Sequence, residues 1–132
     1  MTEPAHHPQS QAASMLKVQG IITLVFGGLG ALLGLILMII FGVALNQAYS
    51  DNDIVEFSIY FIMSVLFVFI PHVYFIVSGI ILIRQPEPKL ARLITIINLI
   101  VGAVANYIVL AFAIISLVQS KEYEEDYKKH KA

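Results

Sequence analysis

A histidine lies near the middle of the second long apolar stretch of this chain, directly after a proline. His72 is the only ionisable side chain, tyrosines aside, in the uncharged stretch 57–83. A histidine at membrane depth suggests a proton relay or a ligand contact. Pro71 cannot donate a backbone hydrogen bond to the carbonyl of Phe67, so we expect a kink whose free carbonyl offers His72 a partner. No carboxylate or second basic group lies within an apolar stretch. A neutral histidine satisfied by a hydroxyl or by the freed carbonyl at the kink is therefore favoured.

Small polar residues recur at helical spacing in the same apolar stretches. In the second stretch, residues seven apart share one face: Ser64, Pro71 and Ser78. In the third stretch, residues four apart share a face: Asn98, Gly102 and Asn106. A carboxamide at membrane depth gains about 0.5–2 kcal/mol from a partner across a helix interface. A structural role is therefore favoured for the two asparagines, and coordination of a substrate or an ion stays open.

Residues for other kinds of chemistry are missing. The chain has no cysteine, which excludes thiolate catalysis, disulfides and cysteine metal sites. It has no His-x-x-x-His metal motif, and His6-His7 in the N-terminal segment has no further ligands. The glycines at 27, 28 and 30 lie inside an apolar stretch with no strand before them, unlike a phosphate-binding loop. We expect no catalytic residue, no metal and no cofactor.

Glycines form a regular face in the first apolar stretch. Gly20, Gly27 and Gly34 are seven residues apart, and Gly30 lies four residues before Gly34. No hydrophobic force acts between helices in lipid, so close backbone approach is a main source of association energy. These glycines predict a packing face, either within the chain, against the third stretch and its Gly102, or between copies.

Long apolar stretches must position all of these residues. The sequence is 58% hydrophobic and only 13% charged, with a mean hydropathy of +0.83; soluble domains carry roughly 25% charged residues. That composition excludes a soluble enzyme and a nucleic-acid binder. Each stretch exceeds the roughly 20 helical residues that cross a bilayer core of about 30 Å. None shows the alternating polarity of barrel strands.

The sequence therefore predicts an all-α integral membrane protein, a bundle of three transmembrane helices with short connections. The membrane domain covers 15–120, with spans at about 18–48, 57–83 and 90–120. Splitting the last span at Gly102 leaves halves of about 14 residues, each too short to cross. A re-entrant hairpin in place of this span stays open.

The charges of the connections predict an orientation. Segment 49–56 carries three acidic residues and no basic one, whereas segment 84–92 carries three basic residues and one acidic one. The positive-inside rule puts 84–92 and the N-terminus, with Lys17, in the cytoplasm of a bacterial cell. Three spans would then place the C-terminus outside, although its segment 121–132 holds four lysines.

Both terminal segments are polar. Residues 1–14 contain two prolines and no apolar periodicity, which indicates a flexible tail. Residues 121–132 form a charged segment of helical character, in which Glu124–Lys128 and Glu125–Lys129 are both favourable i,i+4 pairs.

These features lead to two functional hypotheses. We expect a non-enzymatic multi-pass membrane protein that acts as an accessory or scaffold subunit, or as a homo-oligomer assembled through the glycine face. Its partners would be the lipid bilayer and other membrane helices, from a second copy or another protein, and no nucleic acid. The alternative is a small oligomeric channel or proton-linked transporter that uses Pro71, His72, Asn98 and Asn106.

Overall fold

The computed structural model describes residues 11–131, which form helices joined by short connections and contain no strand. The elements in chain order are α1 (Gln11–Asn46), α2 (Asp51–Met63), the π-helix η1 (Ser64–Phe69), α3 (Ile70–Ile83), α4 (Pro88–Ala105), α5 (Tyr107–Val118) and α6 (Ser120–Lys131). Three helical units in this part of the chain are long and apolar enough to span a membrane: α1, the continuous unit α2–η1–α3, and α4. The predicted all-α class is confirmed, and the three candidate spans agree with the predicted number.

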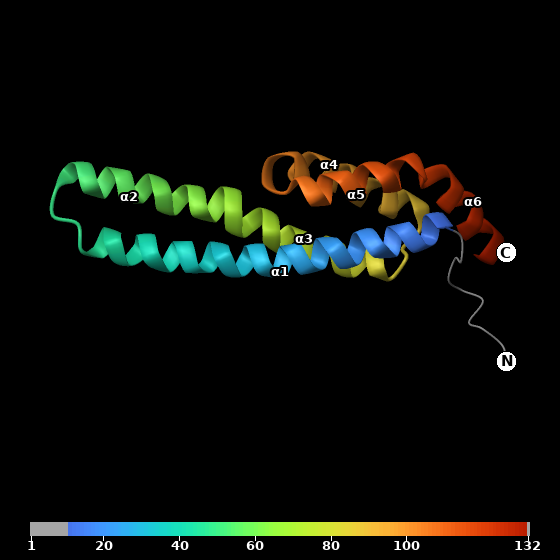
Figure 1. Cartoon of the computed structure of the whole chain (residues 1–132), viewed down its shortest axis with the longest axis horizontal. Coiled ribbons are helices and arrows are strands. Elements are labelled where there is room, and N and C mark those ends of the chain that lie inside the picture. The colour runs from blue at the N-terminus through green and yellow to red at the C-terminus, as the bar shows by residue number, and fades with distance from the viewer. Residues whose placement is uncertain (1–10, 132) are drawn as a thin grey trace.

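The two longest helical units lie side by side and form an extended hairpin (Figure 1). With 36 residues, α1 is about 54 Å long. It begins at Gln11, so residues 11–14 do not belong to a flexible tail as expected. Ala12 and Ala13 are buried there by residues from α3, α4 and α6. The remaining residues of the expected tail, 1–10, which include His6 and His7, lie outside the described residues.

The second unit begins at Asp51, six residues earlier than predicted, because Ser50 caps it. The Ser50 hydroxyl oxygen accepts a hydrogen bond from the backbone N–H of Asp53 at 3.1 Å. Asp51 and Asp53 also place negative charge in the first turn, where the helix dipole favours it. The acidic residues expected in a loop thus belong to the first turns of α2.

The third apolar stretch is not the single helix that we expected over 90–120. The chain breaks at Asn106, which has extended backbone angles (φ −161°, ψ 108°) between α4 and α5. Its side-chain oxygen caps α5 by accepting hydrogen bonds from the N–H groups of Ile108 and Val109 at 3.0 and 3.2 Å. A Cβ atom on Gly102 would lie 2.9 Å from the backbone nitrogen of Leu110, so the two helices touch through their backbones. The hairpin that the sequence left open is therefore the observed arrangement, with its break at Asn106 instead of Gly102.

Because this hairpin returns the chain, both ends of the described chain lie at the same end of the molecule (Figure 1). The Tyr123 hydroxyl of α6 donates a hydrogen bond to the carbonyl of Pro86, 2.5 Å away, just before α4 begins. One apolar cluster joins α1, α3, α4 and α6 there: Ala12, Ala13, Leu16, Leu82, Ala91, Ile94 and Tyr123. The expected placement of the C-terminus on the opposite side of the membrane from the N-terminus depended on a single third helix over 90–120, which is not the observed arrangement.

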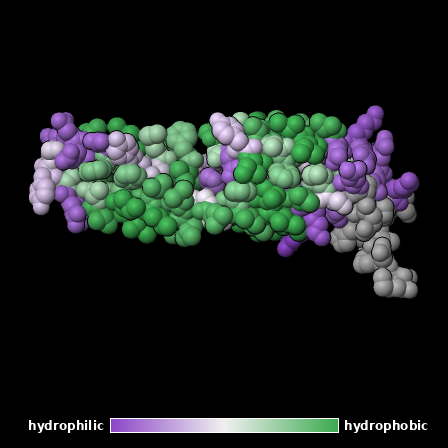
Figure 2. All heavy atoms as spheres, in the orientation of Figure 1, coloured by the Kyte–Doolittle hydropathy of each residue, from purple (hydrophilic) through white to green (hydrophobic). Residues whose placement is uncertain are grey.

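Charge signs are separated along the molecule. The α6 end holds every lysine and arginine of the chain: Lys17, Arg84, Lys89, Arg92, Lys121, Lys128, Lys129 and Lys131. The charged residues at the opposite end are all acidic, namely Asp51, Asp53 and Glu56. Figure 2 shows a hydrophobic belt between the two hydrophilic ends, interrupted by paler atoms at the level of the α4–α5 turn.

Tyr123 links α6 to the rest of the fold, so we expect Tyr123→Phe to lower the free energy of unfolding by about 0.5–1.5 kcal/mol.

Burial first, and then the nearby Tyr127 and Asp126, raise the pKa of Tyr123 above its ordinary value of 10.0. A raised pKa favours the neutral phenol in the folded state. This contribution is present below pH 10.0 and is lost as the pH rises through the raised pKa. Unfolding in detergent from neutral pH to above pH 10.0 should show an alkaline loss of stability that Tyr123→Phe reduces. An equal alkaline loss in both proteins would contradict this role.

Candidate functional site

Three departures from regular α-helix coincide near the middle of the molecule. In η1 the helix is π-helical, and the N–H of Ile70, just after it, donates to the carbonyl of Val65, five residues back. Pro71 and His72 follow immediately in α3. The α4–α5 turn lies at a similar level, and α4 contacts η1 (Figure 1). Because π-helical turns often occur at functional sites, we take this level as the candidate site.

His72 is buried with a hydrogen-bond partner from its own helix. Its ring nitrogen Nδ1 lies 2.6 Å from the carbonyl oxygen of Val68, to which it donates. The ring also packs edge-on against Phe75, with 5.5 Å between the ring centres. We expected a hydroxyl or the carbonyl of Phe67, freed by Pro71, as the partner, and the observed partner is the next carbonyl along the chain, that of Val68. The perturbation expected at the proline takes the form of the π-helical segment.

Gly30 of α1 provides the space that the histidine ring occupies. A Cβ atom on Gly30 would overlap the imidazole of His72. One turn earlier, a Cβ atom on Gly27 would lie 2.7 Å from the backbone nitrogen of Ile76 and 2.9 Å from the carbonyl oxygen of His72. Glycine at both positions therefore lets α1 approach the backbone of α3 directly.

The glycine face as a whole packs against the second span and not against the third stretch. A Cβ atom on Gly20 would lie 2.8 Å from the carbonyl oxygen of Gly79, and one on Gly34 would lie 2.9 Å from the Cα of Phe69. Conversely, a Cβ atom on Gly79 would lie 2.6 Å from the carbonyl oxygen of Gly20. Our sequence interpretation missed Gly79, although it lies seven residues after His72 on the same helix face. Of the predicted packing glycines, only Gly102 packs within the third stretch.

Most of the predicted polar residues are satisfied by their own helices. The Ser64 hydroxyl donates to the carbonyl of Tyr60 at 2.8 Å, and that of Ser78 donates to the carbonyl of Phe75 at 3.2 Å. Asn106 is engaged as the cap of α5. Asn98 differs, because it is fully buried and both polar atoms of its side chain lack a partner within the described part of the chain.

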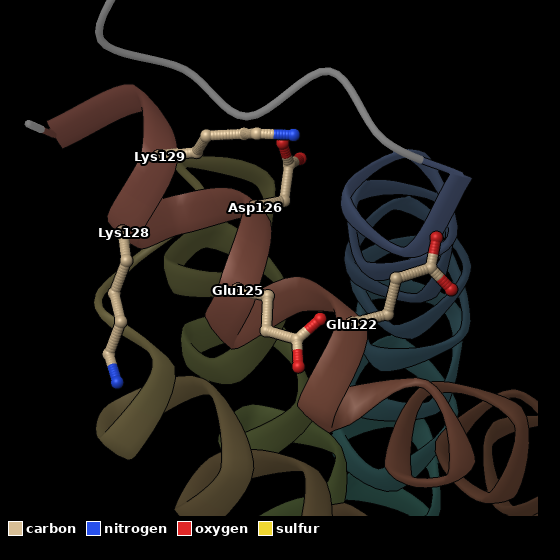
Figure 3. A pocket seen from close by; sticks show the side chains of 5 residues that line it. All are labelled: Glu122, Glu125, Asp126, Lys128 and Lys129. Carbon is tan, nitrogen blue, oxygen red and sulfur yellow. The ribbon is translucent and has the colours of Figure 1, made fainter.

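Charged residues of α6 line a surface hollow and form ion pairs. Figure 3 shows a surface hollow lined by residues of this one helix: Glu122, Glu125, Asp126, Lys128 and Lys129. Of the two predicted pairs, Glu124–Lys128 is confirmed at 3.3 Å, and Glu124 also lies 3.4 Å from Arg92 of α4. Across residues 11–131, no three histidine, aspartate or glutamate side chains are grouped as metal ligands.

Comparisons with known proteins add no family to this geometry. No protein-family model, no curated protein and no solved structure matches the chain. The roles proposed below are therefore argued from the chain's own residues.

The contact between Gly30 and His72 can be tested by a double-mutant cycle. We expect Gly30→Ala to lower the free energy of unfolding by about 1–3 kcal/mol, because the added methyl group overlaps the imidazole. In a His72→Ala background the same methyl group enters free space, so its cost should fall below about 0.5 kcal/mol. Denaturation of the four proteins in mixed micelles measures the coupling. Equal costs of Gly30→Ala in both backgrounds would rule out the contact.

Proposed function

We propose that this chain is a non-enzymatic multi-pass protein of a cell membrane, whose two termini and 84–87 connection lie in the cytoplasm. The separation of charges supports this orientation, because basic residues flank membrane helices on the cytoplasmic side. A hairpin formed by α4 and α5 would then enter and leave the membrane from the cytoplasmic side, and α6 would lie at that surface.

We further propose that the protein is a scaffold subunit that assembles with a second copy in the same orientation. The supporting observation is the α4–α5 turn, which ends partway along α1 (Figure 1) and lies between the two hydrophilic ends of the molecule, where the hydrophobic belt is interrupted (Figure 2). Val104 and Tyr107, on either side of the break, are 71% and 75% exposed. Non-helical backbone at membrane depth requires cover by protein or water, since lipid cannot hydrogen-bond to it.

The chain itself offers a suitable cover. Beyond the turn, α1 and α2 form a two-helix strip with an apolar outer surface, and α2 buries no residue. In a second copy of the same orientation, this strip begins at the depth at which the turn ends. The glycine face, in contrast, is already occupied by α3 and η1. We therefore place self-assembly on the turn and the strip and not on the glycine face.

A photoreactive phenylalanine analogue in place of Tyr107 tests this assembly in the native membrane. We expect a covalent homodimer, because the position faces the second copy. The matched control places the analogue at Tyr49, another exposed tyrosine, which lies in the connection between α1 and α2 and outside the hydrophobic belt. This control should give no dimer. An adduct with a different membrane protein would replace self-assembly by an accessory role in that protein's complex. Adducts with lipid alone would contradict a scaffold function.

A channel or proton-linked transporter is the second candidate, because broken helices and a buried histidine coincide at one level, as at many transport sites. The hydrogen bonds of His72, Ser64, Ser78 and Asn106 within their own helices argue against it. A proton flux in proteoliposomes that His72→Ala abolishes would establish this candidate instead.

A further inference from the structure

Five polar side chains of α1, α4 and α5 are buried, and we call them the polar cluster. Its members are Gln19 and Thr23 from α1, Thr95 and Asn98 from α4, and Ser116 from α5. Each is at most 6% exposed. Buried polar groups are normally hydrogen-bonded, so such a group of neutral side chains needs an explanation.

The cluster is continuous across the helix interface. The Thr95 hydroxyl donates to the side-chain oxygen of Gln19 at 3.4 Å. The helices α1 and α4 run in the same direction (Figure 1), and Thr23 and Asn98 follow Gln19 and Thr95 by about one turn on their own helices. Ser116 and Thr95 line the same small cavity, which residues of α1, α4, α5 and α6 enclose.

Most of the polar atoms in this cluster have no protein partner. Within the described residues, unpartnered buried atoms are Gln19 Nε2, Thr23 Oγ1, Asn98 Nδ2, Asn98 Oδ1 and Ser116 Oγ. The neighbouring Gln119 Oε1 is a further one. Leaving one such group unsatisfied costs about 1–3 kcal/mol. Several at once would exceed what a small fold tolerates, so a ligand must satisfy them.

The cavity beside the cluster limits the size of that ligand. The centre of a water molecule can occupy a volume of about 10 Å³ in this cavity. That is about the smallest volume that holds one bound water. Hydroxyl groups of Thr95, Ser116 and Ser120 line it, and Arg92 and Tyr123 border it toward α6. A metabolite or a lipid headgroup does not fit.

We infer that the polar cluster binds internal water that extends from this cavity toward Asn98. The unpartnered atoms include both N–H donors and oxygen acceptors, and water satisfies both kinds. A cation would face the amide N–H groups of Gln19 and Asn98, and an anion would face the carbonyl oxygen of Asn98. Thr23 lies six residues beyond Lys17, so this water would reach about 9 Å past the last charge on α1.

The test uses the full-length, isotope-labelled chain in nanodiscs. Nuclear Overhauser measurements between water and the side-chain amides of Gln19 and Asn98 should show cross-peaks with the sign of long-lived bound water. Cross-peaks from these amides only to protein protons would overturn the inference, because the carboxamides would then be paired directly with protein groups. Neither result requires a variant to fold.

A pair of buried serines provides matched variants. Ser116→Ala removes a hydroxyl of the cluster and should reduce the water cross-peaks of Asn98 at least twofold. Ser78→Ala removes an equally buried hydroxyl that is already bonded to the carbonyl of Phe75, and it should leave those cross-peaks unchanged. Equal effects of the two substitutions would mean that the water does not bind at the cluster.

Discussion

Replacing Gly27 with leucine should separate α1 from α3 and prevent the packed fold, whereas leucine at the adjacent Gly28 should be tolerated. A Cβ atom on Gly27 meets backbone atoms of α3 at 2.7–2.9 Å, and backbone cannot move aside as a side chain can. A Cβ atom on Gly28 has no neighbour within 4 Å. Because overpacking by single methylenes already costs about 1–3 kcal/mol, we expect Gly27→Leu to lower the free energy of unfolding by more than about 3 kcal/mol.

The two variants share the added side chain, the helix and the loss of glycine flexibility, so their difference isolates the contact. Thermal unfolding in detergent, followed by size-exclusion chromatography, measures it directly. Gly34→Leu should behave like Gly27→Leu, since its Cβ atom would meet the backbone of Phe69. Similar stability of Gly27→Leu and Gly28→Leu would mean that α1 and α3 are not in backbone contact.

The second large effect concerns the orientation, which single cysteines can report because the chain has none of its own. Tyr49→Cys, at the 99%-exposed residue before α2, should react with a membrane-impermeant maleimide added outside intact cells. Glu125→Cys in α6 should react only after permeabilisation, because α6 lies at the opposite, basic end of the molecule. In intact cells we expect nearly complete labelling of Tyr49→Cys and almost none of Glu125→Cys.

Ser14→Cys serves as the control, since it lies near the start of α1 and is exposed at the α6 end. It should follow Glu125→Cys in intact cells and in inverted vesicles. Labelling of Glu125→Cys from outside, with Ser14→Cys protected, would instead require a third helix that crosses the membrane once.

Asn106 shows why the third stretch was misinterpreted. Its spacing from Gly102 and Asn98 suggested one helix with a polar face, and the length of 90–120 suited a single span. The same asparagine is also among the best N-cap residues, and its side chain can satisfy the first N–H groups of a new helix. The residue types alone permit either one continuous helix or a break at Asn106. The backbone contact between Gly102 and Leu110, which no sequence pattern predicts, distinguishes them only once the hairpin has closed.

The polar cluster was recognised only in part. Asn98 was predicted as a polar residue at an interface, but Gln19, Thr23 and Ser116 were overlooked as isolated polar residues in apolar surroundings. One pattern would have found them. Gln19 and Thr23 are four residues apart, and Thr95 and Asn98 are three apart, so each pair occupies one helix face. Which faces meet depends on how the helices pack.

The sequence by itself determined the helical class, the apolar belt, the sign of charge at each connection and the glycine face on α1. These properties depend on composition and on the period of the α-helix, both of which are local. The tertiary structure alone decided that the glycine face packs on α3, that the third stretch returns at Asn106 and that α6 joins the N-terminal end. Each of these depends on which surfaces meet, and several partners of similar apolar character compete for every face. Close fit between particular side chains, such as His72 in the space left by Gly30, selects among them.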